Sequence, residues 1–103
     1  MCGFLGIISN NEIDNELLKK ANNLITCRGP DETKNLNSQE FQDFSIPGFN
    51  FSFIFNRLAI QDLSDTGKQP MYSEEFNSLI MFNGEIFNHI DLRNELEKEG
   101  CRF

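Results

Sequence analysis

The 103-residue sequence lacks three features that would each define a class of protein. It has three cysteines and no Cys-x-x-Cys motif, which argues against a disulfide framework and a thiol redox function and fits a reducing compartment. Its apolar runs are too short to span a bilayer, and no signal peptide pattern precedes them. We therefore expect a cytoplasmic protein that does not enter the membrane.

Positive charge and metal ligands are also scarce. Nine basic residues against sixteen acidic ones leave a net charge of −7, which repels nucleic acid and anionic membranes. The single histidine and the three cysteines do not have the close paired spacing of a structural zinc site. We expect no metal and no cofactor in this chain, and a small molecule or a protein as its partner.

The first half of the chain has the periodicity of one small domain. Residues 3–9 predict a buried strand, and the apolar residues from Ile13 to Ile25 fall on one face of a helix, with Asn10 or Asn11 available as its cap. Residues 28–30, Arg-Gly-Pro, should end that helix. The polar stretch 31–40 predicts a surface loop.

Phenylalanine is abundant where other aromatic residues are rare. Four of the phenylalanines between positions 41 and 55 alternate strictly, which predicts a strand with one aromatic face. Residues 47–48, Pro-Gly, should separate it from a preceding strand by a tight turn. An aromatic face of this size is expected to pack on a second sheet or to invite association. The alternating residues are Phe49, Phe51, Phe53 and Phe55.

The second half reads as loop, strand and helix. A loop is expected over residues 62–70, a buried strand over 79–82, and a helix over 91–99 with Asp91 as its cap and Gly100 as its stop. Ile90, Leu92 and Leu96 should form the apolar stripe of that helix. His89 is expected at its start rather than as a catalytic base. Two helices and about five strands predict an α+β fold.

The N-terminus offers an unusual nucleophile. If Met1 is removed, Cys2 carries both a thiol and a free α-amino group that can serve as its base. An α-amine titrates at about 8 and a thiol at about 8.5, so proton exchange between them is nearly balanced near neutral pH. The alternative is that Cys2 is a small buried hydrophobic residue at the start of a strand.

Two further motifs also have two interpretations each. Asn83-Gly84 suits a hairpin turn, because both residues tolerate positive φ, but a side-chain amide beside a backbone N–H also suits an oxyanion. Arg57 suits either a solvated strand end or the binding of an amino-acid carboxylate by its guanidinium group. Cys27 and Cys101 are expected to be structural.

Four segments carry a family resemblance. In chain order they are residues 1–7 (MCGFLGI), 27–31 (CRGPD), 57–64 with 69–71 (RLAIQDLS and QPM), and 82–88 (FNGEIFN) continuing through 92–93 to 103. Together they resemble the N-terminal glutaminase domain of glutamine-hydrolysing asparagine synthetases. Those enzymes are class II glutamine amidotransferases of the N-terminal-nucleophile (Ntn) hydrolase superfamily.

The resemblance implies a fold and a set of roles. Residues 1–103 would be the N-terminal portion of a four-layer αββα sandwich with antiparallel sheets, a partial type 2 glutamine amidotransferase domain truncated at its C-terminal side. The synthetase domain, which uses ATP and Mg in the family, would be absent. The implied roles are Cys2 as the nucleophile that forms a thioester with glutamine, Asn83 and Gly84 as the oxyanion hole, Arg57 as the carboxylate ligand, and Ile60 and Glu85 as further substrate-binding residues.

The sequence also departs from the family pattern. Cys27 stands where the family usually has His, Phe87 stands where it has Tyr, and the chain stops before the Ser-Asp-x-x-Glu stretch whose aspartate binds the substrate ammonium group. We therefore expect these residues alone to hydrolyse glutamine poorly or not at all, with ammonia passing to a synthetase domain in the intact protein. The alternative is a non-catalytic homologue that acts as an interaction or assembly module, completing its sheets as a homodimer.

Overall fold

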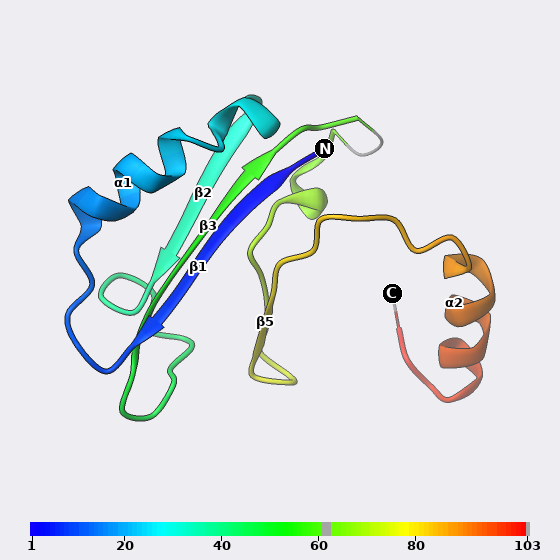
Figure 1. The fold of residues 1–103 in the computed structure, drawn as a ribbon. Helices are drawn as coiled ribbons and strands as arrows, with labels where there is room; N and C mark the ends of the chain where they lie inside the picture. The colour runs from blue at the N-terminus through cyan, green and yellow to red at the C-terminus, as the bar shows by residue number, and fades with distance from the viewer. Residues whose placement is uncertain (61–62, 103) are drawn as a thin grey trace.

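The computed structural model describes residues 1–60 and 63–102 (Figure 1). Within them the chain forms five strands and two α-helices, which confirms the α+β class. Gln61 and Asp62, in the third of the four segments, and Phe103 lie outside the described residues. In chain order the elements are β1 (Gly3–Ser9), α1 (Asn15–Asn23), the 3₁₀ helix η1 (Thr26–Arg28), β2 (Glu32–Asn37), β3 (Asn50–Arg57), the 3₁₀ helix η2 (Asp65–Gly67), β4 (Met71–Ser73), β5 (Ser78–Ile80) and α2 (His89–Lys98).

Three strands form an antiparallel sheet in the order β1-β3-β2. Gly3 lies opposite Asn56 and Ser9 opposite Asn50 in the β1–β3 pair. The strand expected at residues 3–9 is confirmed, but the expectation that it is buried is wrong, because β1 is an outer strand of this sheet. Phe4 and Ile8 of β1 are accordingly exposed.

The expected surface loop at residues 31–40 is wrong, because β2 occupies most of it. Five of its six side chains are polar, Leu36 being the exception, yet its backbone pairs with β3 from Glu32, opposite Arg57, to Asn37, opposite Ser52. Strand pairing needs backbone hydrogen bonds rather than apolar side chains. A search for alternating apolar residues therefore does not detect a mostly polar strand, even where it pairs with a strand rich in apolar residues.

The strand expected just before Pro47 is also wrong. Residues 41–46 form no strand, and a single bridge pairs Ile46 with Phe49. Residues 38–49 instead form the long connection between β2 and β3. The tight turn at residues 47–48 therefore closes a short loop and does not join two central strands.

Three of the four alternating phenylalanines lie in β3, and their face packs toward a second sheet as expected, whereas Phe49 precedes the strand and is exposed. Phe51 and Phe55 are each only 1% exposed. The ring of Phe51 meets the ring of Phe44 edge-on at 5.4 Å, and Phe44 in turn meets Tyr72 of β4 at 6.2 Å. β4 and β5 form an antiparallel hairpin, so the aromatic residues connect the two sheets.

The opposite face of the three-stranded sheet is covered by α1 (Figure 1). Leu18 is buried there, and the side-chain amides of Asn22 and Asn56 exchange two hydrogen bonds of 2.7 and 3.3 Å. Leu17 and Leu24, which the periodicity assigned to the same face, are exposed. Leu17 lies within α1 but on its solvent side, whereas Leu24 directly follows the helix, which ends at Asn23, earlier than residues 28–30 predicted.

The cap of α1 also differs from the expectation. The Oδ1 atom of Asp14 accepts hydrogen bonds from the backbone N–H groups of Glu16 and Leu17, at 2.9 and 3.1 Å. Neither Asn10 nor Asn11 is the cap, because the helix begins four to five residues later than either. Asp14 is preferred as a cap because its carboxylate also suits the positive end of the helix dipole.

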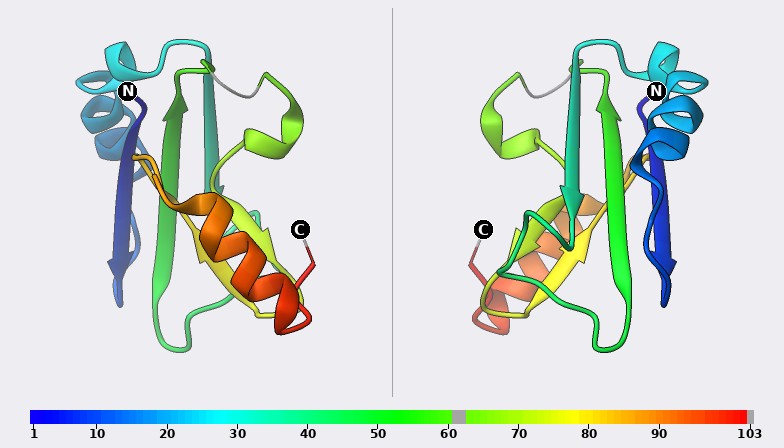
Figure 2. Two further views of the ribbon diagram at one scale, coloured as in Figure 1. Left: turned by 90° about the vertical axis from the view of Figure 1, so that its right-hand side faces the viewer. Right: turned by 90° about the vertical axis from the view of Figure 1, so that its left-hand side faces the viewer.

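The strand expected over residues 79–82 is observed as β5, but it is not buried, since it belongs to a hairpin of only two strands. Ile80 and Phe82 are exposed. Residues 81–86 run without regular structure to α2. Figure 2 shows the hairpin lying obliquely across the sheet, with α2 beyond it.

The last helix starts at His89, two residues earlier than the expected range of 91–99, with Asn88 rather than Asp91 in the cap position; the placement of His89 at the helix start is confirmed. Asp91 lies in the first turn instead. Gly100 ends the helix with a φ of +94°, and the N–H groups of Gly100 and Cys101 donate to the carbonyls of Glu97 and Leu96. This is the Schellman arrangement that favours glycine. The expected apolar stripe of Ile90, Leu92 and Leu96 is exposed.

In Figure 1 the molecule runs from α1 through the three-stranded sheet and the hairpin to α2. The complete four-layer sandwich stays a prediction. No helix in the described part of the chain combines the length and apolar character needed to cross a membrane.

Candidate active site

Cys2 directly precedes β1 and is held against the far end of β3. The backbone N–H of Leu58 donates to its Sγ atom at 3.3 Å, and the carbonyl oxygen of Leu58 lies 3.7 Å from the same sulfur. Nε of Arg28 donates to the carbonyl oxygen of Cys2 at 3.2 Å. Both the side chain and the backbone of this half-buried cysteine are therefore fixed.

A cavity of about 300 Å³ lies beside this thiol. Four separate parts of the chain line it: the N-terminus, the end of β3 with the residues that follow it, the segment before β4 with Gly67 and Gln69, and the stretch between β5 and α2. The structure brings together in this lining all six residues that the sequence singled out. They are Cys2, Arg57, Ile60, Asn83, Gly84 and Glu85.

The interpretation of Asn83-Gly84 as a hairpin turn is wrong. Neither residue is among the described positions with positive φ, which the tight hairpin turn would require. The turn between β4 and β5 falls earlier and contains Asn77, whose φ is 44°. Asn83 and Gly84 instead lie in an irregular stretch at the cavity wall.

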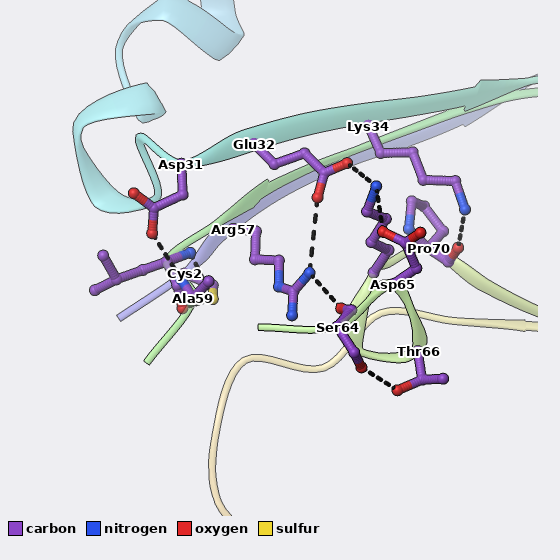
Figure 3. A network of polar contacts seen from close by, with 12 residues as sticks. Cys2, Asp31, Glu32, Lys34, Arg57, Ala59, Ser64, Asp65, Thr66 and Pro70 are labelled. Carbon is purple, nitrogen blue, oxygen red and sulfur yellow. Dashed lines mark hydrogen bonds and ion pairs between the residues drawn. The ribbon is translucent and has the colours of Figure 1, made fainter. Parts of the chain in front are cut away.

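Arg57, the last residue of β3, is not a solvated strand end, since it is 7% exposed. Its Nη1 atom donates to the carbonyl oxygen of Ser64 at 3.0 Å and lies 3.7 Å from Oε2 of Glu32 (Figure 3). A buried guanidinium group needs such partners to offset its desolvation.

Further ion pairs tie the segment before β4 to β2. Nζ of Lys68 lies 3.0 Å from Glu32 and 2.8 Å from Asp65. The hydrogen bond and the charge of Asp65 raise the pKa of Lys68, and the same contact lowers the pKa of Asp65. Nζ of Lys34 donates to the carbonyl oxygen of Pro70 at 3.1 Å. Figure 3 shows this network beside the thiol of Cys2.

Sequence reasoning missed three residues that support the site. Arg28 binds the Cys2 carbonyl as described. Oδ2 of Asp31 accepts from the N–H of Ala59 at 2.8 Å, and the side-chain amide of Gln69 contacts the backbone of Phe82. All three lie in segments that carry the family resemblance, which is the signal that could have found them. Their contacts, however, depend on which backbone groups the fold brings within reach.

The remaining candidates lie away from the cavity. Cys27 and Cys101, expected to be structural, are exposed free thiols. His89 is exposed on α2, with Nδ1 3.1 Å from the carbonyl oxygen of Ile86. Among residues 1–60 and 63–102, no group of three or more histidine, cysteine, aspartate or glutamate side chains could hold a metal ion.

An α+β chain with a thiol, an arginine and an Asn-Gly pair around one cavity has the features of an amidotransferase. The whole chain, residues 1–103, matches the family model described as "Glutamine amidotransferase domain", and the chain belongs to that family. Its curated relatives are asparagine synthetases. It is 38% identical over its full length to "Asparagine synthetase [glutamine-hydrolyzing] 1" of Bacillus subtilis, 34% identical over 96% of its length to a putative synthetase of Methanocaldococcus jannaschii, and 33% identical over 92% to synthetase B of Escherichia coli.

The chain spans only a small part of these relatives: 15%, 21% and 16% of their respective lengths. No solved structure matches the chain significantly. The comparisons therefore give the family of this domain, whereas the activity of a whole synthetase is a matter of proposal.

Proposed function

We propose that this chain is the glutaminase half-site of an asparagine synthetase-like amidotransferase. The observation that carries the proposal is the shared cavity of Cys2, Arg57 and Asn83-Gly84. These residues supply a nucleophile, a carboxylate ligand and two oxyanion donors, which together are what hydrolysis of a side-chain amide requires.

In the first half-reaction, Sγ of Cys2 attacks the side-chain amide carbon of glutamine after Met1 has been removed. The liberated α-amine of Cys2 takes the thiol proton, a C–S bond forms, and the carbonyl oxygen becomes an oxyanion. Asn83 and the N–H of Gly84 stabilise this oxyanion. The α-ammonium then returns the proton to the leaving nitrogen, the C–N bond breaks, and ammonia leaves a thioester on Cys2.

In the second half-reaction, water attacks the thioester carbon. The α-amine of Cys2 accepts a proton from this water, and the same donors at Asn83 and Gly84 stabilise the second oxyanion. The C–S bond breaks, the thiol recovers its proton, and glutamate is released. These steps use only groups of this chain. A reducing cytoplasm would keep the thiol in its active state.

Substrate binding centres on Arg57. The α-carboxylate of glutamine would bind its guanidinium group in exchange for Glu32, which lies 3.7 Å away and keeps Lys68 as a closer partner at 3.0 Å. The backbone of Ile60 would line the cavity, and Glu85 would face the amino-acid end of the substrate. A bidentate carboxylate at a buried arginine gives orientation as well as affinity.

The ammonia would pass to a synthetase domain elsewhere in the intact protein. The names of the relatives, which call them glutamine-hydrolysing asparagine synthetases, support glutamine as the substrate. ATP and Mg would act in that other domain, as the family resemblance implies. No step proposed for this chain depends on either.

The direct test is covalent labelling with a chloroketone analogue of glutamine. Protein shown by mass spectrometry to lack Met1 should gain one adduct at Cys2, and glutamine should protect against it. Cys2→Ala should abolish the adduct. Cys27→Ala and Cys101→Ala, which remove the exposed thiols, should leave it unchanged.

A folded, Met1-free chain that gains no adduct at Cys2 would contradict the proposal. It would favour the alternative, a non-catalytic interaction module. One observation supports that alternative: the exposed apolar side chains around α2, with Phe87 90% exposed. Surfaces of this kind mark sites of protein association.

A further inference from the structure

The side chain of Gln69 holds the peptide backbone directly before Asn83. Its Oε1 atom accepts a hydrogen bond from the N–H of Phe82 at 2.6 Å, and its Nε2 atom donates to the carbonyl oxygen of Phe82 at 3.1 Å. Two simultaneous bonds fix the orientation of a backbone segment as well as its position, as in a strand ladder. Gln69 itself lines the same cavity as Cys2.

The residues on either side of Gln69 are anchored to β2. Lys68 pairs with Glu32, and Pro70, whose side chain is fully buried, accepts the hydrogen bond from Lys34 through its carbonyl oxygen. β2 pairs in turn with β3, beyond whose end Leu58 binds the thiol of Cys2. A continuous series of contacts therefore runs from the thiol, through the sheet and Gln69, to Phe82.

We propose that Gln69 is a positioning residue that sets the distance between the Cys2 thiol and the oxyanion donors of Asn83 and Gly84. This inference rests on the proposed function. Oxyanion donors act only when they lie at about 2.7–3.1 Å from the oxygen that becomes charged. A displacement of about 1 Å can cost a factor of about 100 in rate. The side-chain amide of Gln69 can therefore affect catalysis by holding Phe82, although it does not itself bind the oxyanion.

A purely structural role for Gln69 predicts a different result from a positioning role. If Gln69 only attaches one segment to another, its loss should slow every reaction of Cys2 alike. If Gln69 positions the oxyanion donors, its loss should affect only reactions that generate an oxyanion. Two probes separate these cases. Iodoacetamide forms a C–S bond at a saturated carbon with loss of iodide, whereas the aldehyde of glutamate γ-semialdehyde adds the thiol and gives a tetrahedral hemithioacetal.

The experiment compares the full chain with its Gln69→Ala and Gln69→Glu variants. The control is Gln42→Ala, because Gln42 is an exposed glutamine whose Nε2 atom donates to the carbonyl of Gln39, away from the cavity. For Gln69→Ala we expect semialdehyde affinity to fall about 10- to 100-fold, while the rate of Cys2 alkylation by iodoacetamide stays within about threefold. Gln69→Glu should fall between, because it retains the acceptor for the Phe82 N–H but loses the donor.

Unchanged semialdehyde affinity in Gln69→Ala, or an equal loss in both reactions, would overturn the inference. A wild-type chain that is alkylated but forms no hemithioacetal would instead contradict the proposed function. Hydrogen exchange then tests the position of the segment independently of activity. The amide of Phe82 should exchange at least about tenfold faster in Gln69→Ala than in Gln42→Ala, and equal exchange rates would overturn the role of Gln69.

Discussion

The guanidinium group of Arg57 is buried at the end of β3, so it needs hydrogen-bond acceptors from the protein even when no substrate is bound. Arg57 has Ser64 and Glu32 in this role. The sequence indicated the strand and the arginine, because both follow from local pattern. It could not indicate Glu32, which lies 25 residues earlier in a segment that lacks an apolar period. Only the pairing of β2 with β3 brings the two side chains together.

Arg57→Lys tests the carboxylate site. Lysine retains the charge but cannot form the two parallel hydrogen bonds of a guanidinium fork, so affinity for the chloroketone analogue should fall by about 2 kcal/mol, or roughly 30-fold. The measurement is the concentration dependence of Cys2 labelling. Arg93→Lys is the matched control, because Arg93 pairs with Glu97 on the surface of α2. Equal half-saturating concentrations for the two variants would contradict the role of Arg57.

Gly29 allows a close backbone contact within the CRGPD segment. A Cβ atom at this position would lie 2.1 Å from the carbonyl oxygen of Asn56 and 2.3 Å from its carbon. Both atoms belong to the backbone of the central strand and cannot easily move. Gly29→Ala should therefore lower the free energy of unfolding by about 3 kcal/mol or more, as measured by urea denaturation.

Gly48→Ala provides the comparison for Gly29. A Cβ atom at Gly48 meets nothing within 4 Å, but φ there is +79°. Its cost should come from backbone strain alone, at about 1 kcal/mol. A smaller loss in Gly29→Ala than in Gly48→Ala would show that the contact at Gly29 relaxes on substitution.

At the scale of single elements, prediction worked where a local signal exists. The alternating phenylalanines gave β3, and Gly100 gave the end of α2 through its positive φ. It failed where pairing partners decide the outcome. β2 is polar except for Leu36, so its composition did not reveal a strand. β1 has an apolar sequence but an outer position in the sheet, so its composition did not reveal that it is exposed.

Asp14→Ala tests the observed cap of α1. It removes the acceptor for two backbone N–H groups and a favourable charge at the helix N-terminus, so the free energy of unfolding should fall by about 1 kcal/mol in urea denaturation. Asn10→Ala and Asn11→Ala are the matched controls, since they change the two residues that sequence periodicity favoured. A larger effect at either asparagine than at Asp14 would contradict the observed helix start.

At the scale of the whole molecule, the two helices differ in how they pack. α1 buries Leu18 and Asn22 against the sheet, whereas α2 has no buried residue. A ten-residue helix without packing is marginal in water. Amide hydrogen exchange followed by mass spectrometry should therefore be at least about 100-fold faster in α2 than in β3, with α1 between them. Protection of α2 equal to that of β3 would indicate a partner that covers its apolar stripe.

The candidate site was largely predictable and its supporting contacts were not. Six residues were identified because the sequence segments that hold them resemble those of a family, and all six line one cavity. The contacts of Arg28, Asp31 and Gln69 involve backbone atoms of distant residues. Backbone groups have the same chemistry at every position, so no residue pattern reveals which of them a side chain will reach.

The pairing of β1 with β3 sets the position of Cys2, the proposed nucleophile. One end of β1 is set by Ser9 opposite Asn50, and the other by Gly3 opposite Asn56, immediately after Cys2. Adding or deleting one residue within this seven-residue stretch would move the sulfur by about 3.3 Å and turn it to the other side of the sheet. Insertions or deletions are therefore compatible with the proposed chemistry in the loops but not in β1, which directly follows Cys2.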